Sequence, residues 1–245
     1  MKAFALFLLL ASASGAAAGC NPFAVRITTT PVLYQWTSGL EKATALLGSP
    51  PTHADTILIG DSLLAFWPKD LAEKQFGDGS VWNFAVGGSR TQHVLWQLEN
   101  LKATTLDPRE VVVLIGTNNL SDQALPACAI VEGIKSVAVR LREIWPDATI
   151  RLMGIPPRGS DFHFRDEDRK VVNADVAAWA EAQPGIAYFA VDDVQMTCGR
   201  YTAPLAGGST LASRTNRCAN YADDFGHFRR PGYEVIFTAL RQAAK

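Results

Sequence analysis

The chain has 245 residues, of which 48% are hydrophobic and 19% charged, and its formal net charge at pH 7 is −1. This length allows one α/β domain of ordinary size with a substantial core. Because the composition implies no basic face, we expect neither nucleic acid nor an anionic membrane as a partner.

Residues 1–18 have the pattern of a secretory signal peptide. Lys2 is followed by a short apolar stretch and then by small residues up to Ala18, and the apolar stretch is too short to span a bilayer. The sequence therefore predicts an exported protein, periplasmic or secreted. One alternative stays open, because Ala17-Ala18-Gly19-Cys20 resembles a lipoprotein box without its usual large aliphatic residue. A lipid on Cys20 would anchor the chain to a membrane.

The four cysteines are Cys20, Cys128, Cys198 and Cys218. An even number of cysteines in an exported chain favours disulfides, and no pair has the C-x-x-C spacing of a zinc site. Cys198 and Cys218 bracket a loop rich in Gly, Ser and Thr, so we expect them to pair. Cys20 and Cys128 then pair by elimination, unless Cys20 is lipidated.

Apolar patterns typical of strands and of amphipathic helices alternate five times. The expected strands are 56–59, 81–86, 111–115, 149–153 and 186–191, and the expected helices are 63–75, 91–103, 130–145, 168–182 and 231–243. Such units form a parallel sheet with helices on both faces. Ahead of them, residues 20–31 look extended and irregular, and 34–47 look helical. We expect an N-terminal extension over 19–52 and a single domain over 53–245.

Polar residues follow the expected strands and precede the last helix. They form the groups Gly60-Asp61-Ser62, Gly87-Gly88-Ser89, Gly116-Thr117-Asn118 and Asp224-Phe225-Gly226-His227. Each group alone is explained by helix capping or a turn. Their coincidence at successive strand ends is not, because ligands of parallel sheets bind where the strands end.

These residue types suit catalysis by a serine nucleophile. The hydroxyl of Ser62 needs a base, which His227 can supply, and Asp224 on the same side of a helical turn can orient that imidazole. The backbone N–H groups of Ser62 and Gly88 and the amide of Asn118 can stabilise an oxyanion. We expect no metal or other cofactor in this chemistry.

The same motifs resemble those of the SGNH hydrolases, the GDSL esterase superfamily. Gly60-Asp61-Ser62-Leu63 is similar to the first motif, residues 83–91 to the second, Gly116-Thr117-Asn118-Asn119 to the third, and Asp224-x-x-His227 to the last. Within the superfamily, the third motif and Pro157-Arg158-Gly159 resemble the catalytic subunits of platelet-activating factor acetylhydrolase and their bacterial relatives. The resemblance implies a flavodoxin-like three-layer sandwich with a five-stranded parallel sheet. Ala85 departs from the motif, where a glycine is often found.

We therefore expect an exported serine esterase that cleaves short-chain acyl esters, above all acetyl esters, with carbohydrate esters among its candidate substrates. Two alternatives remain open. The chain could be a lysophospholipase or thioesterase of the same superfamily, or a non-catalytic carbohydrate-binding protein on this scaffold. The sequence predicts no oligomeric state.

Several other side chains are assigned lesser roles. We expect surface roles for His53, His93 and His163, a structural role for Arg158, and support of the turn by Asp61. The segment 195–223 is expected to wall the substrate pocket. Its few large aliphatic residues, Met196, Leu205 and Leu211, argue against a long acyl chain, and Tyr201 and Tyr221 suit a sugar-bearing alcohol.

Overall fold

The computed structural model describes residues 19–77, 79–102, 105–201 and 218–244, so the expected signal peptide lies outside the described residues. The described chain forms a five-stranded, wholly parallel sheet in the order β2-β1-β3-β4-β5. The strands are β1 (Thr56–Gly60), β2 (Val81–Asn83), β3 (Glu110–Leu114), β4 (Thr149–Met153) and β5 (Ile186–Phe189). This strand order is that of flavodoxin-like folds, which confirms the predicted fold class.

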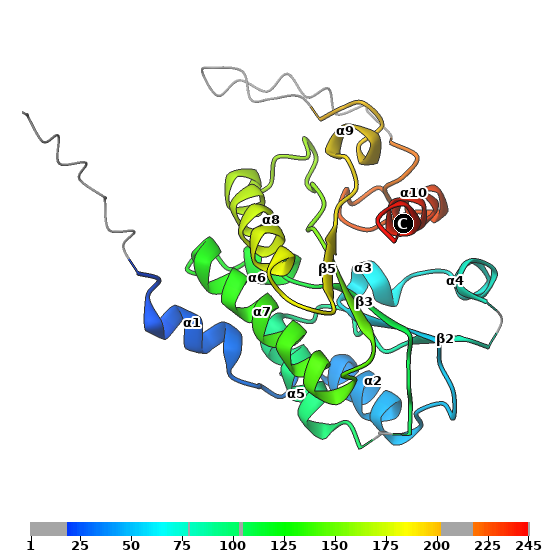
Figure 1. Ribbon diagram of the computed structural model, residues 1–245. Coiled ribbons are helices and arrows are strands. Elements are labelled where there is room, and N and C mark those ends of the chain that lie inside the picture. Colours follow the sequence, from blue (N-terminus) through cyan, green and yellow to red (C-terminus); the bar gives the residue numbers. More distant parts are fainter. Residues whose placement is uncertain (1–18, 78, 103–104, 202–217, 245) are drawn as a thin grey trace, which may run out of the picture.

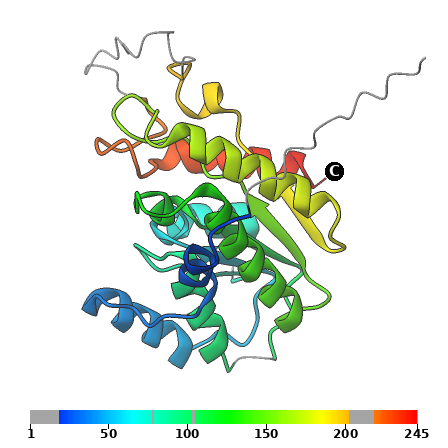
Figure 2. The ribbon, with the colours of Figure 1, turned by 90° about the vertical axis from the view of Figure 1, so that its left-hand side faces the viewer.

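Helices cover both faces of the sheet. They are α1 (Pro22–Thr29), α2 (Thr37–Gly48), α3 (Ser62–Ala65), α4 (Lys69–Phe76), α5 (Thr91–Asn100), α6 (Thr117–Leu120), α7 (Ala127–Ile144), α8 (Asp166–Glu181), α9 (Asp193–Met196) and α10 (Arg230–Gln242). In Figure 1, α1, α5, α7 and α8 lie on one side of the strands, and α3, α4 and α10 on the other. Figure 2 shows α7 and α8 side by side on their face, where the two helices contact each other.

The central strands explain why the sheet needs cover on both faces. Every residue of β1 and β3 is buried. Alternate side chains point to opposite faces, so Ile57 and Val111 join the core beneath α5 and α7, whereas Leu58 and Val112 join the core beneath α3, α4 and α10. A continuous apolar run such as 111–114 in β3 fits this buried central place.

The N-terminal extension contains a helix that the sequence analysis missed. Residues 20–31 were expected to be irregular, but α1 occupies most of them. The side chain of Asn21 accepts a hydrogen bond from the N–H of Phe23, and Pro22 occupies the first turn, so the start signals of a helix are present. The disulfide between Cys20 and Cys128 joins this helix to α7.

Two other expected elements differ in extent. The helix expected over 63–75 is divided into α3 and α4 around Pro68, a position at which a proline can end one helix and precede the next. The second strand ends at Asn83 rather than at residue 86, although the N–H groups of Phe84 and Val86 still donate to carbonyls of β1. This early end frees the following residues to turn across the tip of the sheet.

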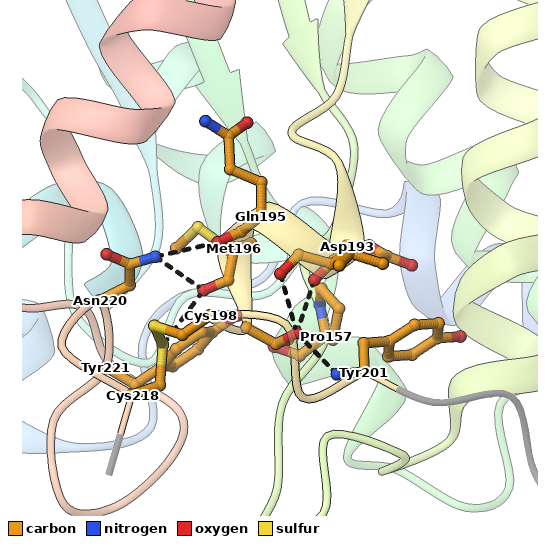
Figure 3. Close-up of a disulfide and its surroundings, with 11 residues drawn as sticks. Pro157, Asp193, Gln195, Met196, Cys198, Tyr201, Cys218, Asn220 and Tyr221 are labelled. Carbon is orange, nitrogen blue, oxygen red and sulfur yellow. Dashed lines mark hydrogen bonds between the residues drawn. A yellow bond between two sulfur atoms is a disulfide. The ribbon is translucent and has the colours of Figure 1, made fainter.

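A second disulfide, between Cys198 and Cys218, lies beyond α9 (Figure 3). Beside it, the amide of Asn220 donates to the carbonyls of Gln195 and Met196, so the chain after Cys218 is fixed to the end of α9. Residues 202–217, between these cysteines, lie outside the described residues. Among the helices that the structure describes, none is long and apolar enough to cross a membrane.

Candidate active site

Ser62 is the first residue of α3, directly after the end of β1. Gly60 makes the turn between them possible, because a Cβ atom there would lie 1.9 Å from the backbone oxygen of Leu114 on the neighbouring strand. No other residue type fits such a close approach. Ser62 is therefore presented at the carboxyl edge of the sheet and at the amino end of a helix.

Asp61 supports this turn and has no access to solvent. Its Oδ1 accepts a hydrogen bond of 2.9 Å from the N–H of Leu63, which caps α3. Burial raises the pKa of the Asp61 carboxyl to about 7, although the Leu63 hydrogen bond and the charge of Arg158 both act to lower it. The position agrees with the supporting role expected from the sequence.

The hydroxyl of Ser62 lies against the imidazole of His227. Oγ of Ser62 is 2.9 Å from Nε2 of His227, and Nδ1 of the same ring is 2.5 Å from Oδ2 of Asp224. The structure thus brings together the three residues that the sequence proposed as nucleophile, base and orienting acid. In this arrangement the imidazole can take the serine proton while the carboxylate stabilises the resulting imidazolium.

Asp224 and His227 do not lie on a helical turn, as the sequence analysis expected. They occupy a loop before α10 that is closed by a bridge between Tyr221 and Phe228. Oδ1 of Asp224 accepts hydrogen bonds from the N–H groups of Gly226 and His227, each 2.9 Å long. Phe225 adopts a left-handed conformation within this turn. Hydrogen bonds to the carboxylate, rather than helical spacing, therefore fix Asp224 beside His227.

Part of the expected oxyanion site lies next to Ser62. A Cβ atom on Gly87 would be 3.8 Å from Cβ of Ser62, and Gly88 follows with a left-handed φ of 78°. The amide nitrogen of Asn118, just after β3, donates to the carbonyl of Ser89 at 2.9 Å. This bond uses one of the two amide hydrogens, so the other can serve an oxyanion.

A cleft of about 430 Å³ extends from Gly88. Its described lining residues come from three parts of the chain and are Gln35, Trp36, Gly88, Arg90, Gln92, His93, Asn118 and Ser121. Phe66 is 57% exposed, and the centre of its ring lies 5.1 Å from that of His227. A Cβ atom on Gly87 would lie 3.9 Å from this ring and 3.8 Å from Cβ of Ser62, so Phe66 borders the site beside the same glycine turn.

Some expected roles are contradicted. His93 is buried rather than on the surface, and Tyr34 stacks on its ring. Tyr221 is also buried, with its hydroxyl donating to the carbonyl of Pro157, and the hydroxyl of Tyr201 donates to Asp166. Neither tyrosine hydroxyl is free for a sugar. Leu205 and Leu211, used to infer the acyl preference, lie outside the described residues.

Arg158 is placed structurally, as the sequence analysis favoured. Its guanidinium donates to the carbonyl of Thr117 and to the hydroxyl of Ser121, and it lies over the ring of Phe164. These contacts hold the loop after β4 against α6, which carries Asn118.

Gln35 and Trp36 are among the cleft residues that sequence reasoning missed. They precede α2, far from any strand end, so the rule that located the other groups could not find them. The local signal was a pair of aromatic residues, Tyr34 and Trp36, in a polar segment before a helix.

Comparison with known proteins identifies the family to which the chain belongs. A model of the GDSL-like lipase/acylhydrolase family matches residues 48–235. Platelet-activating factor acetylhydrolase IB subunit alpha1 of Rattus norvegicus is 33% identical over 137 residues, which are 56% of this chain and 58% of that protein. The chain thus aligns with less than two thirds of the length of this curated relative.

Solved structures show the same fold at low identity. A Streptococcus pneumonia protein whose name refers to platelet activating factor gives a TM-score of 0.64 at 17% identity, covering 85% of this chain and 93% of its own. A GDSL-like lipase from Bacteroides thetaiotaomicron gives 0.55 at 17% identity, covering 83% and 93% of the two chains. Both agree with the three-layer architecture.

Proposed function

The chain belongs to the GDSL-like lipase/acylhydrolase family of ester-hydrolysing enzymes, and from that premise we propose that it is an exported serine esterase for short-chain acyl esters. Ser62 attacks the ester carbonyl, His227 takes the serine proton and then gives it to the leaving alcohol, and Asp224 orients the imidazole. Water hydrolyses the acyl-serine in a second step with the same proton transfers. The observation that carries the proposal is the alignment of Ser62, His227 and Asp224 through two hydrogen bonds.

The oxyanion is assigned to three donors. The N–H groups of Ser62 and Gly88 and the side-chain amide of Asn118 would face the charge that develops on the carbonyl oxygen. Their support is the close approach of the Gly87–Gly88 turn to Ser62 and the position of Asn118 in the same cleft. Preorganised donors of this kind stabilise the transition state more than the ground state.

A preference for acetyl or similarly short acyl groups is supported by the polar cleft. Trp36 is the one large apolar side chain among its described lining residues. The name of the rat relative, an acetylhydrolase, supports the same substrate class. Carbohydrate esters fit this proposal because a cleft lined by amides and an indole suits a polyhydroxylated alcohol.

Export is supported by the signal-like pattern of residues 1–18 and by the two disulfides. We propose that Cys20 is a disulfide partner rather than a lipid anchor, because a sulfur bonded to Cys128 cannot carry a thioether. Residues 19–52 are then an extension that this disulfide joins to the domain formed by 53–245. Mass spectrometry of the exported protein distinguishes the disulfide from a lipidated Cys20.

Labelling with a fluorophosphonate probe tests the proposed nucleophile. The wild-type protein should become labelled at Ser62 and lose its activity on p-nitrophenyl acetate, whereas Ser62→Ala should do neither and keep its circular dichroism spectrum. Labelling or turnover that persists in Ser62→Ala would mean that another residue is the nucleophile. An unlabelled and inactive wild-type protein would favour a non-catalytic role.

A further inference from the structure

The N-terminal extension builds one wall of the cleft beside Ser62. Gln35 and Trp36 line the cleft together with Gly88 and Asn118, two of the proposed oxyanion residues. Both residues precede position 48, where the match to the family model begins. This wall is therefore a feature of the present chain that the family resemblance does not supply.

The extension is held in place along its length. The disulfide of Cys20 ties its start to α7, and the hydroxyl of Thr28 donates to the carbonyl of Ala129 at 2.6 Å. Further along, the N–H of Val32 donates to the carbonyl of Gln92, and the buried hydroxyl of Tyr34 donates to Gln97. With these attachments the wall is preorganised, so a ligand loses little affinity to ordering it.

Trp36 offers an aromatic surface at the proposed oxyanion site. Its indole contacts the Gly87–Gly88 turn so closely that a Cβ atom on Gly88 would lie 3.1 Å from the ring. The rings of Tyr34 and His93 meet it edge to face, with centroids 4.9 and 5.0 Å away. The indole is half-buried, and the C–H groups of a sugar ring are attracted to the negative face of such a π system.

The polar groups of the cleft are neutral or paired. Burial, and then the charge of Arg90, lower the pKa of His93 to about 4, so its ring is uncharged at neutral pH. Nδ1 of His93 accepts from the N–H of Arg90, which leaves Nε2 to donate to the side-chain oxygen of Gln35. The guanidinium of Arg90 lies 3.4 Å from a carboxylate oxygen of Asp122. A neutral ligand rich in hydroxyl groups matches this lining better than an anion does.

We infer that the cleft is a subsite for a neutral sugar ring adjacent to the acylated one, and that Trp36 and Gln35 direct the enzyme toward acylated oligosaccharides. This inference rests on the proposed esterase function of Ser62. The ring stacks on the indole of Trp36, and its hydroxyl groups bind the side-chain amides of Gln35 and Gln92. The sugar that bears the ester lies at Ser62, beside the exposed ring of Phe66.

The test compares acetylated xylotetraose with acetylated xylose, which has the same kind of leaving alcohol but no second sugar ring. In the wild-type protein, kcat/KM should be higher for the oligosaccharide. Trp36→Ala should lower the ratio of the two kcat/KM values by about tenfold, as expected for a lost aromatic contact. Trp36→Phe should restore part of it. Gln35→Ala, which leaves the indole beside Gly88 intact, should lower the ratio in the same direction by a smaller factor.

Phe23→Ala is the matched control, because Phe23 is an aromatic residue of the same extension, 72% exposed and not among the lining residues of the cleft. It should leave both activities unchanged.

A second experiment measures binding by calorimetry. The affinity of the Ser62→Ala variant for unacetylated xylotetraose should fall at least fivefold when Trp36→Ala is added. An unchanged ratio in both cleft variants, or an oligosaccharide turned over no better than acetylated xylose, overturns the sugar subsite while the esterase stands. A wild-type protein that neither hydrolyses p-nitrophenyl acetate nor becomes labelled at Ser62 would instead contradict the proposed function itself.

Discussion

The Nδ1 atom of His227 lies 2.5 Å from Oδ2 of Asp224, within a single turn that precedes α10. Partial burial acts to raise the pKa of the Asp224 carboxyl, but hydrogen bonds from His227 and from the N–H groups of His227 and Gly226 lower it to about 2. Asp224 therefore stays ionised across the working range of an esterase. A lasting negative charge beside Nδ1 keeps the proton there and leaves Nε2 free to act on Ser62.

The triad predicts an order of severity among three variants. Ser62→Ala and His227→Ala should each lower kcat on p-nitrophenyl acetate by about 10⁴-fold or more. Asp224→Ala should be less severe, with a kcat roughly ten- to a hundredfold higher than that of the other two variants. The base survives without its orienting acid, whereas neither nucleophile nor base can be replaced. Steady-state kinetics and the melting temperature of each variant check this. An Asp224→Ala variant as inactive as Ser62→Ala, with an unchanged melting temperature, would assign Asp224 a more direct role.

The buried Asp61 predicts a pH-dependent stability. Its pKa is about 7 in the folded protein against an ordinary 3.8, so the folded state binds this proton more tightly. The resulting stabilisation is fully present below pH 3.8 and is lost as the pH rises through 7. Asp61→Asn keeps a side-chain oxygen that can accept from Leu63 and cannot ionise. The variant should therefore melt at a higher temperature than the wild type at pH 8, with a flatter dependence between pH 4 and 7.

Asp175→Asn, a change at an exposed position on α8, is the control for that measurement and should follow the wild-type curve. Thermal melts at one ionic strength across the pH range are sufficient. If Asp61→Asn and wild type melt in parallel from pH 4 to 8, the Asp61 carboxyl is ionised in the folded state throughout. Its nearest charged neighbour, Arg158, would then outweigh the burial.

Variants of Asn118 distinguish a role in transition-state stabilisation from a role in substrate binding. Asn118→Ala should lower kcat by roughly 10²–10³-fold with little change in KM, because an oxyanion donor acts mainly when the carbonyl oxygen gains charge. Asn118→Asp keeps the shape but removes the N–H groups, so it should be at least as impaired. A raised KM with an unchanged kcat in both variants would make Asn118 a binding residue of the neighbouring cleft.

Much of this architecture could be predicted because its signals are local. The wholly apolar run in β3 and the polar groups after the strands are visible without any tertiary contact. The helix α1 was missed because its apolar residues were weighed without the Asn21 cap. Trp36 could not be located, since its place beside Gly88 depends on how the extension crosses α5 and α7. The turn that joins Asp224 to His227 was taken for a helix because a spacing of three residues fits both.

The two disulfides should separate stability from activity. Cys198 and Cys218 are 20 residues apart and Cys20 and Cys128 are 108 apart, so the chain-entropy model gives them about 3 and about 4.7 kcal/mol. Replacing Cys20 and Cys128 by serine should therefore lower the free energy of unfolding more. Replacing Cys198 and Cys218 should harm turnover of p-nitrophenyl acetate more, because the chain after Cys218 leads into Asp224 and His227. Urea melts and kinetics on the two double variants measure this, and free thiols in the exported wild type would remove its basis.

The lining of the site predicts the acyl preference. Lengthening an acetyl group to an octanoyl group adds six methylenes, and each is worth about 0.8 kcal/mol if buried. Beside Ser62, the described residues offer mainly the exposed ring of Phe66 and the indole of Trp36, and the rest of the cleft is polar. Such a surface cannot bury the added methylenes, while a long chain would displace water from amide groups that it cannot replace.

We therefore expect kcat/KM for p-nitrophenyl esters to fall from acetate through butyrate to octanoate. The fall should lie mainly in KM, because the reacting carbonyl and its donors are the same in all three esters. Phe66→Ala should steepen the fall by removing the exposed apolar ring near His227, whereas Phe23→Ala, on the distant α1, should leave it unchanged. A rise toward octanoate would require an apolar wall elsewhere in the chain. It would favour the lysophospholipase alternative, whose substrate carries a long acyl chain, over an acetyl esterase.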